Sequence, residues 1–456
     1  MNATPSSARQ QQQRITRHRS QTDSLSFFNI LTSRLLFDKV EQVLPPHRER
    51  LFPPTETLSM FLAQVMNADQ SLQQAVNEAA ISRLRSSLPV CSIHSGGYCR
   101  ARQRLPLEMV TELTRYLGEE IEQRVPDEWR WHGRRVLLVD GTTVTMPDTP
   151  SNQAAFPQQG GQLPGLGFPI CRIVGITSLA TGAILNAAIG RFNGKGSGER
   201  GLLREIQDTM QSGDVLLGDA FYPTYFFLAT MQERGVDVLM EQDGSRRRST
   251  DYRRGQRLGH RDHLIVIDKP KIPDWMNRED YEAAPANITI REFHAGGKTM
   301  VTTLVDVHKN GLKELYRCRW HIELDIRQIK DTMGMNILRC KMAEMATKEI
   351  WVHLLGYNLI RLMMSQSALM ADIHVREISF KHCLQLWSSW LKCGGYEIDS
   401  YLELFALMAK KRVANRPGRI EPRAVKRRPK AYSLLTKPRD LARQLVLEFG
   451  HPKKLK

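Results

Sequence analysis

The chain has 456 residues and a mass of 52.2 kDa, and its hydrophobic fraction of 41% and charged fraction of 25% are ordinary for a protein with a large buried core. Lys and Arg outnumber Asp and Glu by 65 to 48, so the net charge is +17. The seven cysteines form no CxxC pair, and no apolar run is long enough for a membrane span or a signal peptide. These features argue against a disulfide scaffold, a zinc ribbon and a membrane protein, and they favour a reduced, cytoplasmic protein.

The positive charge is concentrated at the C-terminal end. From residue 410 to residue 456 there are 16 basic and three acidic residues, a net of +13, whereas the rest of the chain carries +4. Several prolines interrupt this tail, so we expect an extended segment that lies along a polyanion. Nucleic acid is the first candidate for that polyanion. The alternative is a clamp that pairs with acids on the protein's own body. The candidate nucleic-acid contacts in the tail are Arg416, Arg419, Lys426, Arg427 and Arg428.

Composition and periodicity divide the chain into four parts. Residues 1–25 are rich in Gln, Ser, Thr and Arg and are expected to be disordered. Residues 26–130 carry apolar side chains at helical spacing, which predicts a helical N-terminal domain. Residues 131–372 are expected to form the main domain, and residues 373–456 a helical region that ends in the basic tail.

The main domain shows alternating strand and helix patterns. Short apolar runs predict strands at 135–140, 172–179, 183–192, 214–217 and 236–240, and helical patterns lie at 198–210 and 224–234. This alternation predicts an α/β fold with a mixed sheet flanked by helices. Between residues 241 and 311 several β-branched runs are separated by turn residues, which predicts a β-rich insertion.

Two aspartates follow apolar runs of this domain. Asp140 comes directly after Val136–Val139, and Asp219 follows Val215–Gly218. In an open α/β sheet, ligands bind at the carboxyl ends of the strands, so both acids are candidates for a site. The alternative is that each is an ordinary turn or helix-capping aspartate.

A third acid lies in the segment from Tyr316 to Lys330. On one continuous helix Tyr316, Arg319, Glu323 and Lys330 fall within an arc of about 60°, beside an apolar stripe, whereas Asp325 falls outside the arc. Glu323 is therefore the better candidate for a site. The alternative is a solvated charged face whose Arg–Glu pair contributes only a few tenths of a kcal/mol, roughly, to stability.

Asp140, Asp219 and Glu323 together predict a metal site. Carboxylates that converge from two strands and a helix repel one another unless a cation neutralises them, and hard oxygen ligands suit Mg²⁺ or Mn²⁺. Two such ions would serve phosphoryl transfer, and Arg319 and Lys330 could then bind phosphates beside the scissile bond. Two further acids, Asp148 and Asp214, are spare candidates.

The spacing of these residues resembles a known family. Leu138-Val139-Asp140-Gly141-Thr142, the run from Leu216 to Tyr222, and Tyr316-x2-Arg319-x3-Glu323-x6-Lys330 together resemble a DDE transposase of the insertion-sequence-four family. The resemblance covers about residues 134–370, and the basic tail is similar as well. The spacing of Tyr316, Arg319, Glu323 and Lys330 is highly specific for this family, whereas either aspartate motif alone is a weak signal.

The resemblance implies a fold and a set of roles. It implies a ribonuclease-H-like catalytic core with a β-rich insertion between Asp219 and Glu323, and these two acids with Asp140 as catalytic and metal-binding residues. Tyr316, Arg319 and Lys330 would contact the DNA backbone. Recognition of the transposon ends would be assigned to the N-terminal helical domain by analogy alone. Trp275 in the insertion could stack on a flipped base, or it could simply pack within a hairpin.

The function that follows is a Mg²⁺- or Mn²⁺-dependent transposase with two metal ions. It would cut and join DNA at the terminal inverted repeats of its own insertion sequence and in a target, act as a homodimer on DNA, and reside in the bacterial cytoplasm at the nucleoid, with no membrane association. The alternatives are a catalytically idle DNA-binding protein derived from such an enzyme and a nuclease that cuts without rejoining.

Overall fold

A computed structural model of the chain describes residues 52–413 and 437–450, apart from positions 68, 86, 89–90, 195, 245–249 and 394–397, together with positions 38, 40, 42 and 44. The predicted disordered segment 1–25 lies outside the described residues. The five candidate contacts of the tail also lie outside them. They are Arg416, Arg419, Lys426, Arg427 and Arg428.

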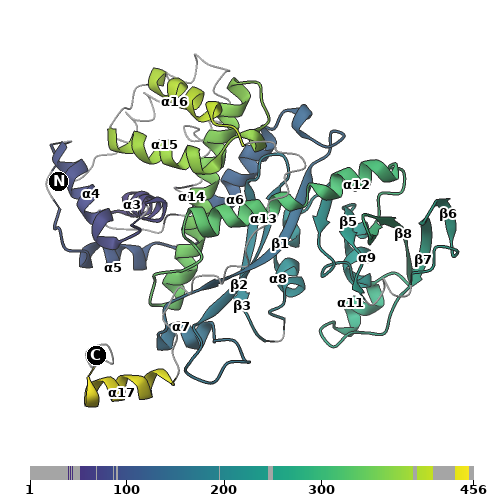
Figure 1. Cartoon of the computed structure of the whole chain (residues 1–456), viewed down its shortest axis with the longest axis horizontal. Helices are drawn as coiled ribbons and strands as arrows, with labels where there is room; N and C mark the ends of the chain where they lie inside the picture. Colours follow the sequence, from purple (N-terminus) through teal and green to yellow (C-terminus); the bar gives the residue numbers. More distant parts are fainter. Residues whose placement is uncertain are drawn as a thin grey trace.

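One mixed sheet organises the described part of the chain. Its nine strands have the order β3-β2-β1-β4-β5-β9-β8-β7-β6 (Figure 1). The strands are β1 (Val136–Thr145), β2 (Ile170–Ser178), β3 (Ile184–Arg191), β4 (Val215–Gly218), β5 (Asp237–Glu241), β6 (Gln256–Gly259), β7 (Asp262–Asp268), β8 (Asn287–Ala295) and β9 (Lys298–Thr302). Strands β1, β2 and β3 form an antiparallel meander, and β1, β4 and β5 are parallel to one another. The predicted mixed sheet with flanking helices is therefore confirmed.

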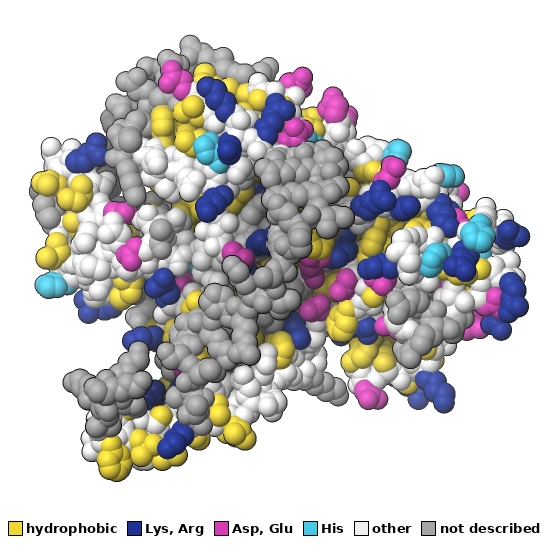
Figure 2. Space-filling model, in the orientation of Figure 1, with side chains coloured by type: hydrophobic (Ala, Val, Ile, Leu, Met, Phe, Trp, Pro, Cys, Tyr) yellow, Lys and Arg dark blue, Asp and Glu magenta, His cyan; other side chains and the backbone are white. Residues whose placement is uncertain are grey.

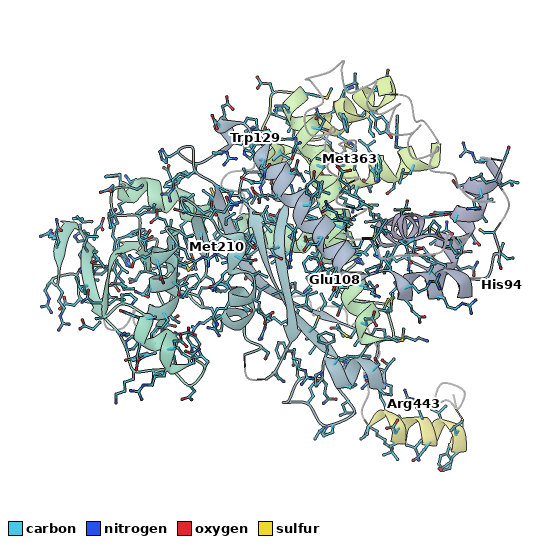
Figure 3. All side chains as sticks on the ribbon, turned by 180° about the vertical axis from the view of Figure 1, so that it is seen from behind. His94, Glu108, Trp129, Met210, Met363 and Arg443 are labelled. Carbon is cyan, nitrogen blue, oxygen red and sulfur yellow. The ribbon has the colours of Figure 1, made fainter. Side chains whose placement is uncertain are left out.

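Helices cover both faces of this sheet. The α-helices are α3 (Pro54–Met66), α4 (Leu72–Arg85), α5 (Gly96–Arg104), α6 (Leu107–Gln123), α7 (Pro150–Ala155), α8 (Glu199–Glu205), α9 (Tyr225–Glu233), α11 (Arg278–Ala283), α12 (Lys309–Arg317), α13 (Trp320–Arg327), α14 (Ala343–Met370), α15 (Phe380–Cys393), α16 (Ile398–Lys410) and α17 (Arg439–Phe449). Helices α8 and α9 pack on one face, whereas α6, α12, α13 and α14 pack on the other. Seen from behind, α17 with Arg443 stands apart from the main body (Figure 3).

The apolar strands alternate between the two faces. On β1, Leu137 and Val139 pack with α8 and α9, whereas Val136 and Leu138 pack with α12 and α13. All four side chains are at most 4% exposed. A strand that is covered on both faces reads as a continuous apolar run, which explains why the sequence shows no polar alternation here.

Helix α14 is the centre of the larger core cluster. It has 28 residues and contacts α3, α6, α15 and α16. Its residues 350–364 are buried apart from a half-buried Leu359. In the described part of the chain, no helix is both long enough and apolar enough to cross a membrane.

The β-rich segment after β5 extends the same sheet. Strand β9 pairs antiparallel with β5, and β8, β7 and β6 follow outward (Figure 1). Buried polar pairs hold this extension: Arg291 donates two hydrogen bonds of 2.8 Å to Asp262, and His263 contacts Glu292 at 3.2 Å. The boundaries 241 and 311 remain a prediction.

The single helix expected from Tyr316 to Lys330 is wrong. Tyr316 lies in the last turn of α12, which ends at Arg317. Arg319 is the N-cap of α13, and Lys330 lies in a π-helical turn over Gln328–Thr332. Tight i to i−3 backbone hydrogen bonds from Cys318 to Leu315 and from Arg319 to Tyr316 break the helix. Leu315 and Ile322, on the two sides of the junction, are both buried in the same apolar cluster against the sheet.

Candidate active site

Asp140 and Asp219 lie at the same level of neighbouring parallel strands. Leu138 on β1 pairs with Leu217 on β4, so two further residues along each strand bring Asp140 level with Asp219. By strand alternation both aspartates fall on the face that α12 and α13 cover. Asp219 follows β4 directly, as predicted. The placement of Asp140 at a strand end is wrong, because β1 continues to Thr145 through its antiparallel pairing with β2.

The environment of Asp140 disfavours its charged form. Burial raises its pKa to about 6, and the nearby carboxylates of Asp219 and Glu199 add to the rise. A hydrogen bond of 2.8 Å from the Gly141 backbone and the guanidinium of Arg319 act in the opposite direction. A carboxyl group with acidic neighbours and little solvent is one that a bound cation would ionise.

Glu199 is an acid of this region that the sequence analysis missed. It begins α8 and reaches β1 from the opposite face of the sheet, where a Cβ on Gly141 would lie 2.4 Å from its carboxyl carbon. Tyr222 donates a hydrogen bond of 3.3 Å to Glu199, and burial and Asp219 raise the pKa of Glu199. An acid in the first turn of a helix is common, so its position in the sequence carried no signal.

Arg319 connects the third predicted acid to the aspartates. Its Nη2 donates a hydrogen bond of 2.8 Å to Oε1 of Glu323, and its charge also acts on Asp140 and Tyr316. Glu323 is therefore linked to Asp140 through a shared cation. Among the residues that the structure describes, no three His, Cys, Asp or Glu side chains form a ready-made metal site.

Lys330 and Tyr316 also lie against these strands. The Lys330 ammonium donates to Thr142 Oγ1 at 3.1 Å and to the Thr143 carbonyl at 2.7 Å, just beyond Asp140 on β1. Burial raises the pKa of Tyr316 to about 12, and Asp219 is among the acids that act on it. Lys330 thus contacts β1, and the charge of Arg319 acts on Asp140, although no single helix carries the four spaced residues.

The comparisons with known proteins decide the family. The model of the transposase DDE domain family matches residues 131–359, half of the chain. The chain belongs to the DDE transposase domain family. The transposase InsG for insertion sequence element IS4 of Escherichia coli (strain K12) is 26% identical over 408 residues, which cover 84% of this chain and 88% of that relative. The resemblance to the insertion-sequence-four family is thereby confirmed.

One solved transposase structure matches the chain with low structural similarity. The cryo-EM structure of the piggyBac transposase synaptic complex with hairpin DNA matches with a TM-score of 0.40 and 9% identity, over 87% of this chain and 86% of that one.

Other acids of this DDE family member have structural partners. Asp325 is fully buried, and its carboxylate accepts hydrogen bonds of 2.5 Å from Arg361 and 2.7 Å from Arg376. The spare candidate Asp214 pairs with Arg135 at 2.7 Å, and Asp148 pairs with Arg439 at 2.5 Å. Each of these three carboxylates therefore has a structural partner that explains its position.

Trp275 packs partly against the core and remains 45% exposed. The Arg204 guanidinium lies 4.0 Å from the centre of its ring, and Phe226 meets it edge to face at 6.1 Å. The indole thus contacts side chains of α8 and α9, as well as solvent. Both interpretations of Trp275 therefore stay open.

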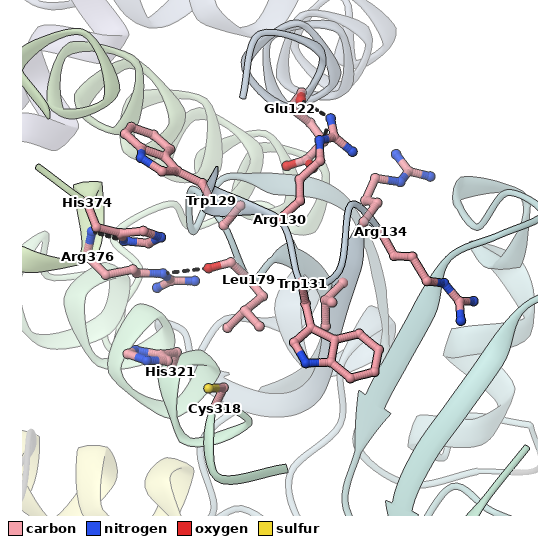
Figure 4. Close-up of a pocket in the computed structure, with 13 residues that line it drawn as sticks. Glu122, Trp129, Arg130, Trp131, Arg134, Leu179, Cys318, His321, His374 and Arg376 are labelled. Atoms are coloured by element: carbon pink, nitrogen blue, oxygen red, sulfur yellow. Dashed lines mark hydrogen bonds and ion pairs between the residues drawn. The ribbon is translucent and has the colours of Figure 1, made fainter. Parts of the chain in front are cut away.

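A separate cavity lies near the beginning of β1. It has a volume of about 340 Å³ and is lined by Trp129, Trp131, His321 and Arg376 among others (Figure 4). Burial, followed by Arg376, lowers the pKa of His321 to about 4, so this histidine is neutral near pH 7. None of the three predicted catalytic acids lines the cavity.

Proposed function

We propose that this DDE family member is a metal-dependent DNA transposase, which cuts DNA at the terminal inverted repeats of its own insertion sequence and joins the ends to a target. The observation that carries the proposal is the level placement of Asp140 and Asp219 on parallel strands, with Glu323 linked to Asp140 by Arg319. The order β3-β2-β1-β4-β5, with one antiparallel meander and two parallel neighbours, supports a ribonuclease-H-like core.

The donor set fits Mg²⁺ or Mn²⁺. Asp140, Asp219 and Glu323 offer hard carboxylate oxygens. The pKa of Asp140 is raised first by burial and then by the carboxylates of Asp219 and Glu199, and a divalent cation would offset both effects. These three residues would hold two ions, which activate a water or a 3′-hydroxyl and stabilise the leaving oxygen when bound. Glu323 must then exchange its hydrogen bond with Arg319 for this role.

Arg319, Lys330 and Tyr316 would position the DNA. A phosphate beside the scissile bond competes with Glu323 for the Arg319 guanidinium, because a charge-assisted bidentate contact is stronger than a half-exposed ion pair. Lys330, anchored on Thr142, offers a second charge next to Asp140. The contact with DNA thereby frees Glu323 to face the aspartates.

The partners follow from the same chemistry. The enzyme would bind both transposon ends and target DNA as a homodimer, since two ends must be cut together, and would act in the bacterial cytoplasm at the nucleoid. The N-terminal helical domain of residues 26–130 remains the candidate for recognition of the ends. The proposed boundaries of the catalytic domain, 131 and 372, enclose the matched residues 131–359.

A strand-transfer assay tests this function. Purified protein, DNA that carries the ends flanking the coding region, and a supercoiled target plasmid are incubated with Mg²⁺, Mn²⁺ or EDTA. We expect joined products with either metal and none with EDTA or with Asp219→Asn. Cleavage without joining would favour the nuclease alternative. Binding without cleavage in either metal would favour the idle alternative, which the lack of a ready-made metal site among the described residues keeps open.

A further inference from the structure

The outer end of the insertion gathers cations from three elements. His260 and Arg261 form the turn between β6 and β7, His294 lies near the end of β8, and Lys309 begins α12. The space-filling view shows histidine, lysine and arginine side chains side by side at this end of the molecule (Figure 2). Lys313, one helical turn after Lys309, is also exposed. We call these five residues the outer basic cluster.

Hydrogen bonds hold the cluster together. The Lys309 ammonium donates to the carbonyl oxygens of His260 at 2.8 Å and Arg261 at 3.4 Å. The backbone N–H of His294 donates to the same Arg261 carbonyl at 2.9 Å. The turn, the strand and the helix are thus fixed relative to one another, so the positive charges are brought together by the fold.

The turn keeps Arg261 at a backbone cost. Gly259 pairs with Asp262, so His260 and Arg261 form a two-residue connection, and Arg261 has a φ of +48°. This left-handed conformation favours Gly or Asn. A strained arginine at the tip of an exposed hairpin points to a role for its side chain beyond the turn.

The acid Asp262 acts on Lys309, but it is itself paired with Arg291. In the described part of the chain, no carboxylate forms an ion pair with His260, Arg261, His294 or Lys309. Burial lowers the pKa of His294, and Arg261, Lys309 and His260 lower it further. His260, Arg261, His294 and Lys309 therefore face one another as groups that repel when charged, above the paired Asp262 and Arg291.

We infer that the outer basic cluster is a binding site for the phosphate backbone of duplex DNA, separate from the site around Asp140. The inference rests on the proposed function, which makes DNA the substrate. Phosphates relieve the repulsion among the cations, and backbone contacts carry affinity with little sequence information. The cluster lies at the far end of the sheet from β1, so it would hold DNA away from the cut (Figure 1).

The variant that tests the site best is Arg261→Gly. Glycine adopts the left-handed conformation freely, so this change removes the charge without a cost to folding, and we expect an equal or higher melting temperature. DNA affinity should fall, and the slope of log K against log salt should become shallower by about 0.9 for each phosphate that the variant no longer neutralises. Lys313→Ala should act in the same way. The matched control is Lys271→Ala, an exposed cation of the insertion outside the cluster.

Binding is measured by fluorescence anisotropy in EDTA, so that no cleavage interferes and failure of the strand-transfer assay leaves this result intact. Two duplexes are compared: one from the flank of the coding region and one unrelated. We expect equal losses of affinity on both. An unchanged salt slope for Arg261→Gly and Lys313→Ala would overturn the inference, as would a loss confined to the flanking duplex, which would indicate base recognition. A change in oligomeric state with unchanged DNA binding would instead assign the surface to a second copy of the chain.

The pH dependence provides a second readout. A phosphate raises the pKa of His294, which its cationic neighbours lower in the free protein, so binding takes up a proton. Affinity should therefore rise as the pH falls from 7.5 to 5.5, and His294→Gln should reduce this rise. An identical pH profile for the wild type and His294→Gln would remove His294 from the site.

Discussion

The carboxyl group of Glu199 occupies the space beside Gly141 in which a Cβ would lie, 2.4 Å from the carboxyl carbon. Gly141 directly follows Asp140, and its N–H donates to the Asp140 carboxylate at 2.8 Å. A side chain at Gly141, next to the predicted catalytic Asp140, would therefore displace the carboxyl end of Glu199.

Gly141→Ala should therefore impair cleavage. The methyl group pushes the Glu199 carboxyl group away and so changes the surroundings of Asp140, on whose pKa Glu199 acts, and a small misplacement of a catalytic group costs about 100-fold in rate. DNA affinity should stay within a factor of two or so, because phosphate contacts dominate it. The double variant Gly141→Ala/Glu199→Ala removes the clash. If the single variant cleaves normally, the contact has no influence on the site.

Asp140→Asn should stabilise the metal-free protein near neutral pH. Because the folded pKa of about 6 lies above that of an unfolded aspartate, the folded state binds more protons, and stability falls as the pH rises from about 4 to 6. The cost above pH 6 is about 2–3 kcal/mol at most. Urea unfolding in EDTA at pH 4.5 and 7.5 measures it: the wild type should lose stability over this interval, and Asp140→Asn should lose less. Equal losses would show that Asp140 is not perturbed by its neighbours.

Glu323 and Asp325 should behave in opposite ways although they are two residues apart. Glu323→Gln should abolish cleavage with a loss of stability below about 1 kcal/mol, because its pair with Arg319 is partly exposed. Asp325→Asn leaves Arg361 and Arg376 buried with reduced pairing, which costs about 3–5 kcal/mol. Urea unfolding and a cleavage assay on both variants measure the contrast. An active Glu323→Gln would exclude that residue from catalysis.

Arg319→Ala and Lys330→Ala should each reduce cleavage and weaken binding near the end of the element. Both cations lie next to Asp140, where a phosphate beside the cut would be held. Arg319→Lys should recover little of the activity if the contact is bidentate. Footprinting of the DNA end together with cleavage rates checks this. Full activity of both alanine variants would restore the solvated-face interpretation.

Removal of the basic tail should flatten the salt dependence of DNA binding. The truncation should begin after Val413, because the backbone of Lys411 and Val413 pairs with residues 379 and 377 of the body. Each phosphate that the tail neutralises contributes about 0.9 to the slope of log K against log salt. Arg439→Ala is the control for the clamp alternative, since Arg439 pairs with Asp148 and lies over Phe168. A truncated protein with an unchanged slope but a lower melting temperature would favour the clamp.

Local sequence was enough to recognise the family and most of the elements. The spacing of Tyr316, Arg319, Glu323 and Lys330 is a property of the chain itself, and the apolar runs of β1, β4 and β5 are long enough to be read directly. A buried parallel strand must be apolar on both faces, so its pattern survives in any tertiary context.

Tertiary structure decided what those residues contact. The continuation of β1 beyond Asp140 depends on pairing with β2. Asp325 is structural because Arg361 and Arg376, 36 and 51 residues away, converge on it. Such contacts join residues that are distant in the chain, and periodicity reports only which face a residue occupies, not which partner the fold brings to it.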